Sequence, residues 1–498
     1  MSVKNTIDEI TRILGREKVV TEEGILREYS RDQSFTRPCM PDAIVFAEKV
    51  EDVQNVIKIA NKNLTPVIPY SSGMNLCGAT IPSQGGIILN LTRMNKILQV
   101  SLRERWVLIE AGVTYKQLTD ELKKHGLRVM IPFGTPPSRS VVSSIIEGDP
   151  TLASASFDYG NSLYMDLEIV LPTGDLLRIG KGMVYINGEW APVGGGGIYG
   201  AQNVYSWLWQ SAHGTLGIVT KMVVKAEYLP KARKIFFLTF DRLEDSIEVV
   251  RRIQRREIGL ECFAVNSFNL AAILTKEWKI PEKFPCRIRR SEEFEALKTK
   301  LPRWVYIIHL TGLPYFPEEK IAYEEEALNE VCKEFNIKPK TTILNIGEEE
   351  IISREILEPW GVLKKANYKG SIHPVCFYTT MDKIQDFEDT IHRLAEDYNY
   401  PTDDIGGYIL PVERARNCYC EFEFYCNMDD SEDVEKVKSL WIKAHEVIAN
   451  KGGVLAKPYG PIAEILYKRV DPIYMEKLRE IKQRLDPNNI MNPGKLIF

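Results

Sequence analysis

The sequence predicts an α+β protein built from two domains, and three observations support this. The chain has 498 residues, several times the size of a typical domain. In its first half, short apolar strands alternate with amphipathic helices. Near residue 230 the pattern changes, and strands then alternate with long, charged helices. Such a change within one chain indicates a second structural unit.

In the first part, apolar residues three and four apart predict helices, and short apolar runs between turns predict strands. Gly126 closes the third helix, and the turn at 172–175 separates the last two strands. The expected helices cover residues 3–15, 50–62 and 114–125, and the expected strands cover 41–47, 65–69, 86–91, 106–111, 166–171 and 176–179.

The second part begins after Pro230, within residues 226–240, which start a new strand. Two further β-rich stretches, 303–311 and 419–425, predict a second sheet with helices on one face. The expected helices of this part cover residues 243–257, 317–335, 383–398 and 432–450.

The composition excludes several classes of protein. It is ordinary for a globular chain, with 44% hydrophobic and 27% charged residues. Lys and Arg number 64 against 68 Asp and Glu, so we expect neither nucleic acid nor an anionic membrane as a partner. No window approaches the roughly 20 apolar residues that span a bilayer. The acidic, amphipathic N-terminus is not typical of a signal or transit peptide, so we expect a cytoplasmic protein without a transmembrane segment.

The cysteines and histidines do not form a recognisable metal site. Nine scattered cysteines disfavour a disulfide framework. Cys418 and Cys420 are two residues apart, so both thiols would face one side of a strand. A metal would need further ligands, and none lies at ligand spacing, so buried structural cysteines are the favoured interpretation. The six histidines form no HxH or HExxH pattern, and we expect no metal.

Three segments rich in small residues, 69–78, 132–148 and 209–221, are candidate ligand loops. In the first, Ser71, Ser72 and Gly73 offer backbone N–H groups with little side-chain bulk, as close approach of a diphosphate requires. This first segment matches neither GxGxxG nor GxxxxGK[ST], which excludes the Rossmann and P-loop interpretations. The glycine run 194–197 is either a flexible loop or part of a ligand site.

The order of these loops resembles the vanillyl-alcohol oxidase / p-cresol methylhydroxylase flavoprotein superfamily, which includes flavin subunits of glycolate and D-lactate dehydrogenases. The resemblance covers nearly the whole chain. It is most specific in PYSSGMNLCG, QSAHGTLGIVTK and the tail 485–495, which is similar to a closing DPxxxxNPGK signature. It implies a two-subdomain FAD-binding domain interrupted by an α+β cap domain. The implied boundaries are 1–228 for the FAD-binding domain, 229–455 for the cap or substrate domain, and 456–498 for the segment that returns to the FAD-binding domain.

The resemblance also implies which residues hold FAD. The first loop would cradle the pyrophosphate, the second would border it, and the third would meet the flavin or adenine end. The implied residues are Pro69, Ser71, Ser72, Gly73, Met74, Asn75, Leu76, Gly134, Thr135, Ser143, Ser144, Gly148, Gly217, Ile218, Val219 and Asn492.

The implied FAD is noncovalent. Some relatives tether it through a histidine in the first loop, where this chain has Met74 and Asn75. Others use a histidine in a cap strand, where this chain has Asn417 and Cys418. A cysteinyl-flavin at Cys418 or Cys77 stays as a minor alternative.

Two arginines are candidates for binding a substrate carboxylate. Hydride transfer to flavin N5 needs a base for the substrate O–H proton and a cation for any carboxylate. Arg414 and Arg416, two apart on an expected strand, point the same way and can form a bidentate clamp. Glu421 and Glu423 can equally neutralise them in a solvated ladder, so both interpretations stay open.

The other catalytic candidates follow from the end of the expected cap. By resemblance Lys457 and Tyr459 lie near the flavin, and His373 is the best imidazole candidate, although a lone histidine is more often structural. The D-2-hydroxy-acid branch carries a metal-binding HxxGDGNxH stretch and an EHG motif, whereas this chain has ERARNCYCEF and AKPYG. The phenol-oxidising branch carries a Tyr-Arg pair that Pro458 and Tyr459 replace here. Neither substrate class transfers cleanly.

The resemblance therefore implies an FAD-dependent dehydrogenase. It would oxidise a small organic alcohol or hydroxy acid and pass electrons to an iron–sulfur or other electron-transfer protein. The alternatives are an oxygen-reducing oxidase and a flavin-binding electron-transfer subunit without its own substrate. A homodimer is one expected assembly.

Overall fold

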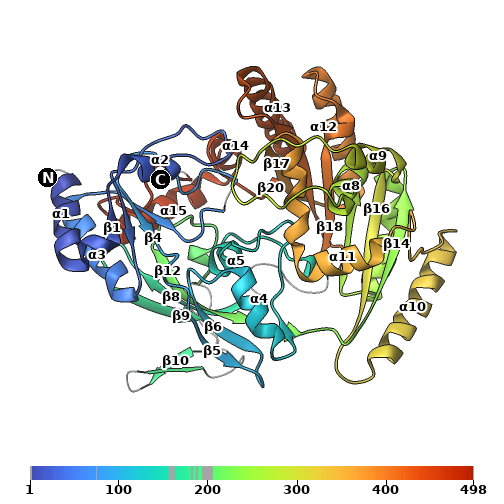
Figure 1. Ribbon diagram of the computed structural model, residues 1–498, viewed down its shortest axis with the longest axis horizontal. Coiled ribbons are helices and arrows are strands. Elements are labelled where there is room, and N and C mark those ends of the chain that lie inside the picture. Colours follow the sequence, from blue (N-terminus) through green and yellow to red (C-terminus); the bar gives the residue numbers. More distant parts are fainter. Residues whose placement is uncertain are drawn as a thin grey trace.

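The computed structural model describes residues 3–74, 76–155, 163–180, 183–186, 189–192 and 206–496. Asn75 and the glycine run 194–197 lie outside the described residues. Figure 1 shows two halves side by side, with the blue-to-green first part in one and the yellow-to-orange second part in the other. The expected α+β class is confirmed.

The described part of the first half contains two larger sheets, besides the two-stranded pairs of β10 (Met183–Ile186) with β11 (Glu189–Pro192) and of β7 (Leu127–Arg128) with β13 (Glu227–Tyr228). In one, with strand order β1-β2-β4-β3, the three strands β2, β4 and β3 run parallel. The other is antiparallel, with order β5-β6-β12-β8-β9. The strands are β1 Val19–Val20, β2 Ala43–Phe46, β3 Val67–Tyr70, β4 Ile87–Asn90, β5 Ile97–Ser101, β6 Trp106–Glu110, β8 Tyr164–Val170, β9 Leu176–Gly180 and β12 Ile218–Lys225.

Helices cover these sheets with their apolar faces. In α3, Val53, Val56 and Ile57 recur at helical spacing and are fully buried. Thr114 and Gln117 form a capping box that fixes the start of α4. The helices of this half are α1 Val3–Leu14, α2 Glu23–Glu28, α3 Val50–Asn63, α4 Tyr115–Lys123 and α5 Val141–Ile146. Each helix and strand that we expected in this half is present.

The second half is built on one seven-stranded antiparallel sheet, with order β14-β16-β15-β18-β19-β17-β20. The change of pattern near residue 230 is the start of β14. The strands are β14 Ala232–Phe240, β15 Glu261–Asn266, β16 Trp304–Gly312, β17 Ser371–Thr379, β18 Gly406–Val412, β19 Asn417–Cys426 and β20 Val454–Leu455.

Helices cover both faces of this sheet, so the expectation of helices on one face is wrong. One face packs on α7 Ile247–Arg255, α10 Pro317–Glu334, α12 Ile384–Asp397 and α13 Ser431–Asn450. The other packs on α8 Ser267–Leu274, α9 Glu292–Lys300 and α11 Glu348–Leu357. Helix α8 carries no amphipathic pattern, because every residue from Phe268 to Leu274 is buried.

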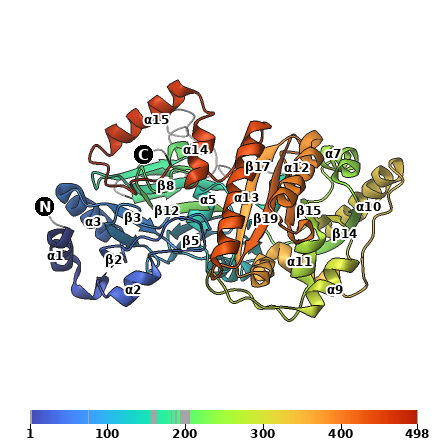
Figure 2. The same ribbon diagram turned by 90° about the horizontal axis from the view of Figure 1, so that it is seen from above.

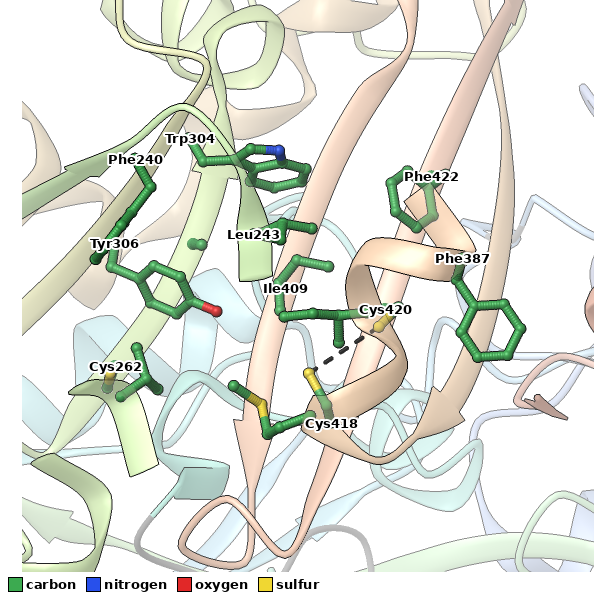
Figure 3. Packing of buried hydrophobic residues seen from close by; sticks show 14 of the residues in the cluster. Phe240, Leu243, Cys262, Trp304, Tyr306, Phe387, Ile409, Cys418, Cys420 and Phe422 are labelled. Carbon is green, nitrogen blue, oxygen red and sulfur yellow. Dashed lines mark hydrogen bonds between the residues drawn. The ribbon is translucent and has the colours of Figure 1, made fainter. Parts of the chain in front are cut away.

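The Cys418 and Cys420 thiols lie on one face of β19, as expected, with 4.0 Å between the sulfur atoms. Both are buried in the apolar cluster of the α7, α10, α12 and α13 face (Figure 3). Trp304, Tyr306 and Phe422 pack in the same cluster. Structural burial of these cysteines is therefore confirmed.

Buried contacts join the halves, and the C-terminal tail returns to the first half. Arg128 on β7 (Leu127–Arg128) forms a buried ion pair of 2.7 Å with Glu261 on β15, and His309 on β16 lies 2.8 Å from the same carboxylate. After α14 (Pro461–Tyr467) and α15 (Pro472–Leu485), Met491 bridges Val67 of β3. Figure 2 shows the red α15 lying over the blue and green first half.

Within the part of the chain that the structure describes, no helix is both long enough and apolar enough to cross a membrane. The boundaries at 228/229 and 455/456 and the cytoplasmic location stay predictions.

Candidate active site

The small-residue loops surround one cavity, cavity 1, beside the ends of β3 and β12. Gly73 has a φ of +64°, and a Cβ there would meet the Tyr70 hydroxyl at 1.9 Å. Gly217 has a φ of +143°, and a Cβ there would meet the Val170 carbonyl oxygen at 2.8 Å. Both loops therefore depend on glycine to hold their backbone near the cavity.

Cavity 1 is almost uncharged. Its lining is small, apolar or hydroxylic, and Glu147 is its one acidic residue among those described. His213 also lines it, and burial lowers the pKa of this imidazole to about 3, so the ring is neutral at physiological pH. A ligand anion here would therefore depend on backbone N–H groups. The lining includes Pro69, Ser71, Ser72, Gly73, Met74, Ser143, Gly217, Ile218, Val219 and Asn492.

Asn492 provides an unused acceptor at this cavity. Its Nδ2 donates hydrogen bonds to the Ala79 oxygen at 3.1 Å and to the His213 oxygen at 2.7 Å, which ties the first and third loops together. Its Oδ1 is buried and has no hydrogen-bond partner. A buried amide oxygen of this kind is suited to a ligand that brings an N–H or O–H donor.

A second cavity, cavity 2, adjoins the first and shares Met74 and Glu147 with it. It lies between the second loop and the β17, β18 and β19 part of the large sheet. Phe133 and Tyr408 both line it and stack on each other, with ring centroids 5.3 Å apart. The two cavities together connect the first half with the large sheet of the second half.

One end of cavity 2 holds a buried charge cluster from loops on both sides. Arg139 contacts Glu147 at 2.8 Å and Asp149 at 2.5 Å, and the Lys457 ammonium also contacts Asp149. Burial opposes these charges, but Arg139 and then Lys457 hold the pKa of Asp149 below its usual value. Asp149 in turn raises the pKa of Lys457, so both groups stay ionised.

The opposite wall carries two glutamates on β19. Lys365 contacts Glu423, and the Tyr425 hydroxyl donates to it at 2.8 Å. Burial acts against the Glu423 charge, but Lys365 outweighs it and keeps the pKa below its usual range. Burial, followed by the neighbouring Glu423 charge, raises the pKa of Glu421 to about 8. The Tyr419 hydroxyl donates to Glu421 Oε2 at 2.9 Å.

The structure brings most, but not all, of the sequence-predicted residues together. Leu76, Gly134, Thr135 and Lys457 line cavity 2 rather than cavity 1. Ser144 is buried and bonds Asp149, and neither Ser144 nor Gly148 is part of either lining.

Tyr459 and His373 line a third cavity, cavity 3, which shares Cys77 and Lys457 with cavity 2. The His373 ring stacks on Phe35, and burial lowers its pKa to about 3. Neither side chain lines cavity 2.

Arg414 and Arg416 lie away from all three cavities. The expected strand is wrong at this point, because residues 413–416 form the turn between β18 and β19. Both arginines are exposed, and Arg414 pairs with Glu257 at 2.6 Å. The alternative of a solvated ladder is also wrong, because Glu423 is 1% exposed and pairs with Lys365.

Cys418 faces away from cavity 2, which removes it as a flavin tether.

Arg139, Asp149, Lys365, Tyr408 and Tyr419 were not among the residues predicted from the sequence. The sequence contained one indication of the buried charges, in the run NCYCEFEFYC. Cysteine and aromatic residues occupy both alternating positions of this strand, so both faces are apolar and any glutamate within it must be buried. The positions of Lys365 and Arg139 carried no comparable signal.

Comparison with known proteins agrees with this geometry. Residues 41–180 match the family described as FAD binding domain, and residues 416–496 match the C-terminal domain of FAD linked oxidases. The chain thus carries the FAD binding domain and the C-terminal domain of FAD linked oxidases, which makes it an FAD-linked oxidoreductase. This oxidoreductase is 21% identical to a glycolate oxidase subunit of Bacillus subtilis over all of this chain and 97% of that protein. It is 30% identical to the 4-cresol dehydrogenase flavoprotein subunit of Pseudomonas putida over 54% of this chain and 50% of that protein.

Solved structures show the same fold. A crystal structure of p-cresol methylhydroxylase with substrate bound superposes with a TM-score of 0.82 at 20% identity, over 99% of this chain and 96% of that one. The FAD binding domain at residues 41–180 makes FAD the cofactor of this oxidoreductase, and cavity 1 fits it. The free Asn492 oxygen can accept from a ribityl hydroxyl or ring N–H, and the small-residue loops leave backbone N–H groups for the diphosphate. In the described ranges, no group of three or more His, Cys, Asp or Glu side chains could hold a metal ion.

Proposed function

We propose that this oxidoreductase oxidises the CH–OH group of a small alcohol or hydroxy acid, with FAD in cavity 1 and the substrate in cavity 2. The observation that carries the proposal is the junction of the two cavities at Met74 and Glu147, which lets a ligand in one adjoin a ligand in the other. When bound, FAD accepts the hydride of the substrate C–H bond at its N5 atom.

Glu421 is the proposed acceptor of the substrate O–H proton. It lines cavity 2, and the hydrogen bond from Tyr419 fixes its Oε2. A carboxyl with a pKa of about 8 exchanges a proton near neutral pH, where a general base is most effective. Lys457 serves instead as a fixed positive charge, because Asp149 keeps it protonated.

The proposed domains follow the same division. Residues 1–228 and 456–498 form the FAD-binding domain, and residues 229–455 form the cap. Strands β14 to β20 share one sheet, and the return of Met491 to β3 supports the assignment of the tail.

The proposed FAD is noncovalent. The described histidines that line the three cavities are His213, His373 and His445, and none of them occupies the first-loop or cap-strand position used for tethering by the relatives that the chain resembles. Acid precipitation should therefore release intact FAD into the supernatant. Flavin that stays with the precipitate would contradict this.

The electrons are proposed to pass to an iron–sulfur or other carrier protein. Two of the relatives are named as subunits, which supports a partner of this kind. Reoxidation of the reduced protein by oxygen separates the alternatives, because a dehydrogenase reoxidises slowly and an oxidase rapidly.

Anaerobic flavin reduction tests the proposal. The FAD-loaded protein is mixed with a panel of alcohols and hydroxy acids, and bleaching of the flavin absorbance is followed. At least one compound should bleach the flavin. If dithionite reduces the flavin and no member of the panel does, the chain is an electron-transfer subunit without its own substrate.

A further inference from the structure

The loop between α8 and α9 is strongly basic. Its residues 279–290, here called the basic loop, hold five cations and one carboxylate, Glu282, in a chain whose formal net charge is -4. All five cations are exposed, and they are Lys279, Lys283, Arg287, Arg289 and Arg290. Within the described ranges, Lys283 pairs with Glu28 of α2 at 3.4 Å, and no ion pair forms at the other four cations. Most of the positive charge of the basic loop is therefore available to a partner.

The acidic residues that follow the basic loop are engaged within and beside α9. Glu293 accepts a hydrogen bond from the Lys276 N–H at 2.9 Å, and Glu295 pairs with Lys298 at 3.1 Å. Glu292 also lies in the first turn of α9, where a carboxylate is stabilised by the positive end of the helix dipole. These three carboxylates therefore serve the start of the helix, and the arginines before it keep their charge.

The basic loop is fixed against one wall of cavity 2. Asn367 Nδ2 donates a hydrogen bond to the Lys279 oxygen at 2.8 Å, and the Arg289 N–H donates one to the Asn367 oxygen at 2.8 Å. Asn367 lies in the chain between Lys365 and Ile372, which both line cavity 2. In Figure 1 the yellow-green loop between α8 and α9 extends toward the first half, in agreement with the contact to α2. A partner seated on the basic loop would be separated from cavity 2 by this one segment.

Exposed apolar side chains lie among these cations. Ile280 is 37% exposed and Ile288 is 41% exposed. Protein interfaces combine apolar contacts with a polar rim, and arginine is enriched in them. Residues 279–290 form no helix, whereas a helix with one apolar face is the usual element that lies on a membrane surface. These features favour an acidic protein surface over an anionic membrane as the occupant of the basic loop.

From this arrangement we propose that the basic loop is the docking site of the electron-transfer partner, and that the partner presents an acidic face around its redox centre. For each hydride taken from the substrate, the reduced protein gives one electron to each of two one-electron carriers and releases one proton to solvent. This inference rests on the proposed transfer of electrons to a carrier protein, and it names the surface that the carrier binds and the charge of its face.

A redox protein of inverted surface charge tests the docking site. Succinylated cytochrome c carries a one-electron haem on an acidic surface, and native cytochrome c carries the same haem on a basic one. Each is titrated into the oxidised, FAD-loaded protein at low ionic strength, and the dissociation constant is measured by calorimetry. The double variant Arg287→Glu/Arg290→Glu should bind the succinylated form at least about tenfold more weakly than wild type, and added salt should weaken wild-type binding. The same variant should not weaken binding of the native form.

A matched variant controls for the change in net charge. Arg479→Glu/Arg484→Glu reverses two exposed arginines on α15, which also form no ion pair within the described ranges. It should leave the affinity for succinylated cytochrome c within about threefold of wild type. If the folded variant of the basic loop binds this probe as wild type does, or if the α15 variant loses as much affinity as the loop variant, the proposal is overturned.

Electron transfer gives a second readout that needs no organic substrate. The protein is reduced with stoichiometric dithionite and mixed anaerobically with oxidised succinylated cytochrome c, and haem reduction is followed by absorbance. The Arg287→Glu/Arg290→Glu variant should lower the second-order rate constant about tenfold. A rate constant within about twofold of wild type would show that electrons leave at another surface and would overturn the proposal.

These readouts separate the docking site from the proposed oxidation and from a membrane contact. If the basic loop variant behaves as expected but no alcohol or hydroxy acid bleaches the flavin, the docking site stands and the oxidation fails. If an alcohol bleaches the flavin and the variant binds the acidic probe as wild type does, the oxidation stands and the docking site is wrong. Vesicles of phosphatidylserine and phosphatidylcholine that bind wild type but not the variant, while both bind the acidic probe equally, would assign the basic loop to a membrane and overturn the proposal.

Discussion

Cavities 1 and 2 adjoin but are built on opposite principles. Cavity 1 is lined by small and apolar residues of three loops, with Glu147 as its single described acid. Cavity 2 is lined by three cations, four carboxyls and several aromatic rings from the loops and the large sheet. The first suits a large cofactor held by backbone groups, and the second suits proton transfer and selection by charge.

The difference locates where substitutions should matter most. In cavity 1 much of the binding surface is main chain, so one side-chain substitution removes little of the binding free energy of the cofactor. In cavity 2 every charged lining side chain that the structure describes, except Glu421, is part of a buried ion pair, so removal of one partner leaves an uncompensated charge.

The largest effect on stability is expected for Lys365→Met. This change leaves Glu423 buried without its cation, and the free energy of unfolding should fall by about 3–5 kcal/mol. The denaturant midpoint of the cap, followed by tryptophan fluorescence, measures it. The double variant Lys365→Met/Glu423→Leu should recover most of the loss. Equal midpoints for wild type and Lys365→Met would show that cavity 2 tolerates a lone charge.

A smaller effect is expected for Asn492→Leu in cavity 1. The change removes the free Oδ1 acceptor and also the two Nδ2 hydrogen bonds that tie the first and third loops together, and each hydrogen bond of about 0.5–1.5 kcal/mol corresponds to up to about tenfold weaker FAD binding. Quenching of flavin fluorescence during titration of the apoprotein gives the dissociation constant. Asn488→Leu in the same tail, where the side chain bonds Asn61, is the control. Unchanged FAD affinity in Asn492→Leu would mean that the orphan oxygen faces no cofactor donor.

The smallest effect is expected for Arg414→Ala. The guanidinium is half exposed and pairs with Glu257, so stability should change by about 0.5 kcal/mol or less. Because the residue lies outside the cavities, kcat/KM should stay within about twofold for neutral and acidic substrates alike. A large loss of kcat/KM confined to carboxylated substrates would restore the carboxylate clamp and contradict the placement of Arg414 outside the cavities.

Cavity 1 could be largely predicted from the sequence because its residues occur in contiguous small-residue loops. Ser71, Gly73 and Gly217 needed no long-range information, since glycine and serine mark close backbone approach wherever they fold. Asn492 was predicted only because the tail of the chain resembles the closing signature of the family.

Cavity 2 could not be predicted in the same way, because its charges are paired across the fold. Lys457 and Asp149 are separated by 308 positions, and Lys365 and Glu423 by 58. The prediction for Arg414 and Arg416 was wrong for a local reason. Glu413, Arg414 and Ala415 adopt φ values of +50°, +57° and +60°. They form a left-handed turn that contains no glycine, the residue by which such a turn is usually recognised in a sequence.

The proposed oxidation in cavity 2 depends most on Glu421 as the proton acceptor. The decisive measurement is the pH dependence of anaerobic flavin reduction by an accepted alcohol, in wild type and in Glu421→Gln, with Glu388→Gln as control. A base must be deprotonated to act, so the wild-type rate should rise with pH and level off above about 8. The Glu421→Gln variant should lose this rise of the rate with pH and should react about 10²–10⁴-fold more slowly. If the Glu421→Gln variant keeps both the rise with pH and a rate within tenfold of wild type, another group accepts the proton and cavity 2 is not the site of oxidation.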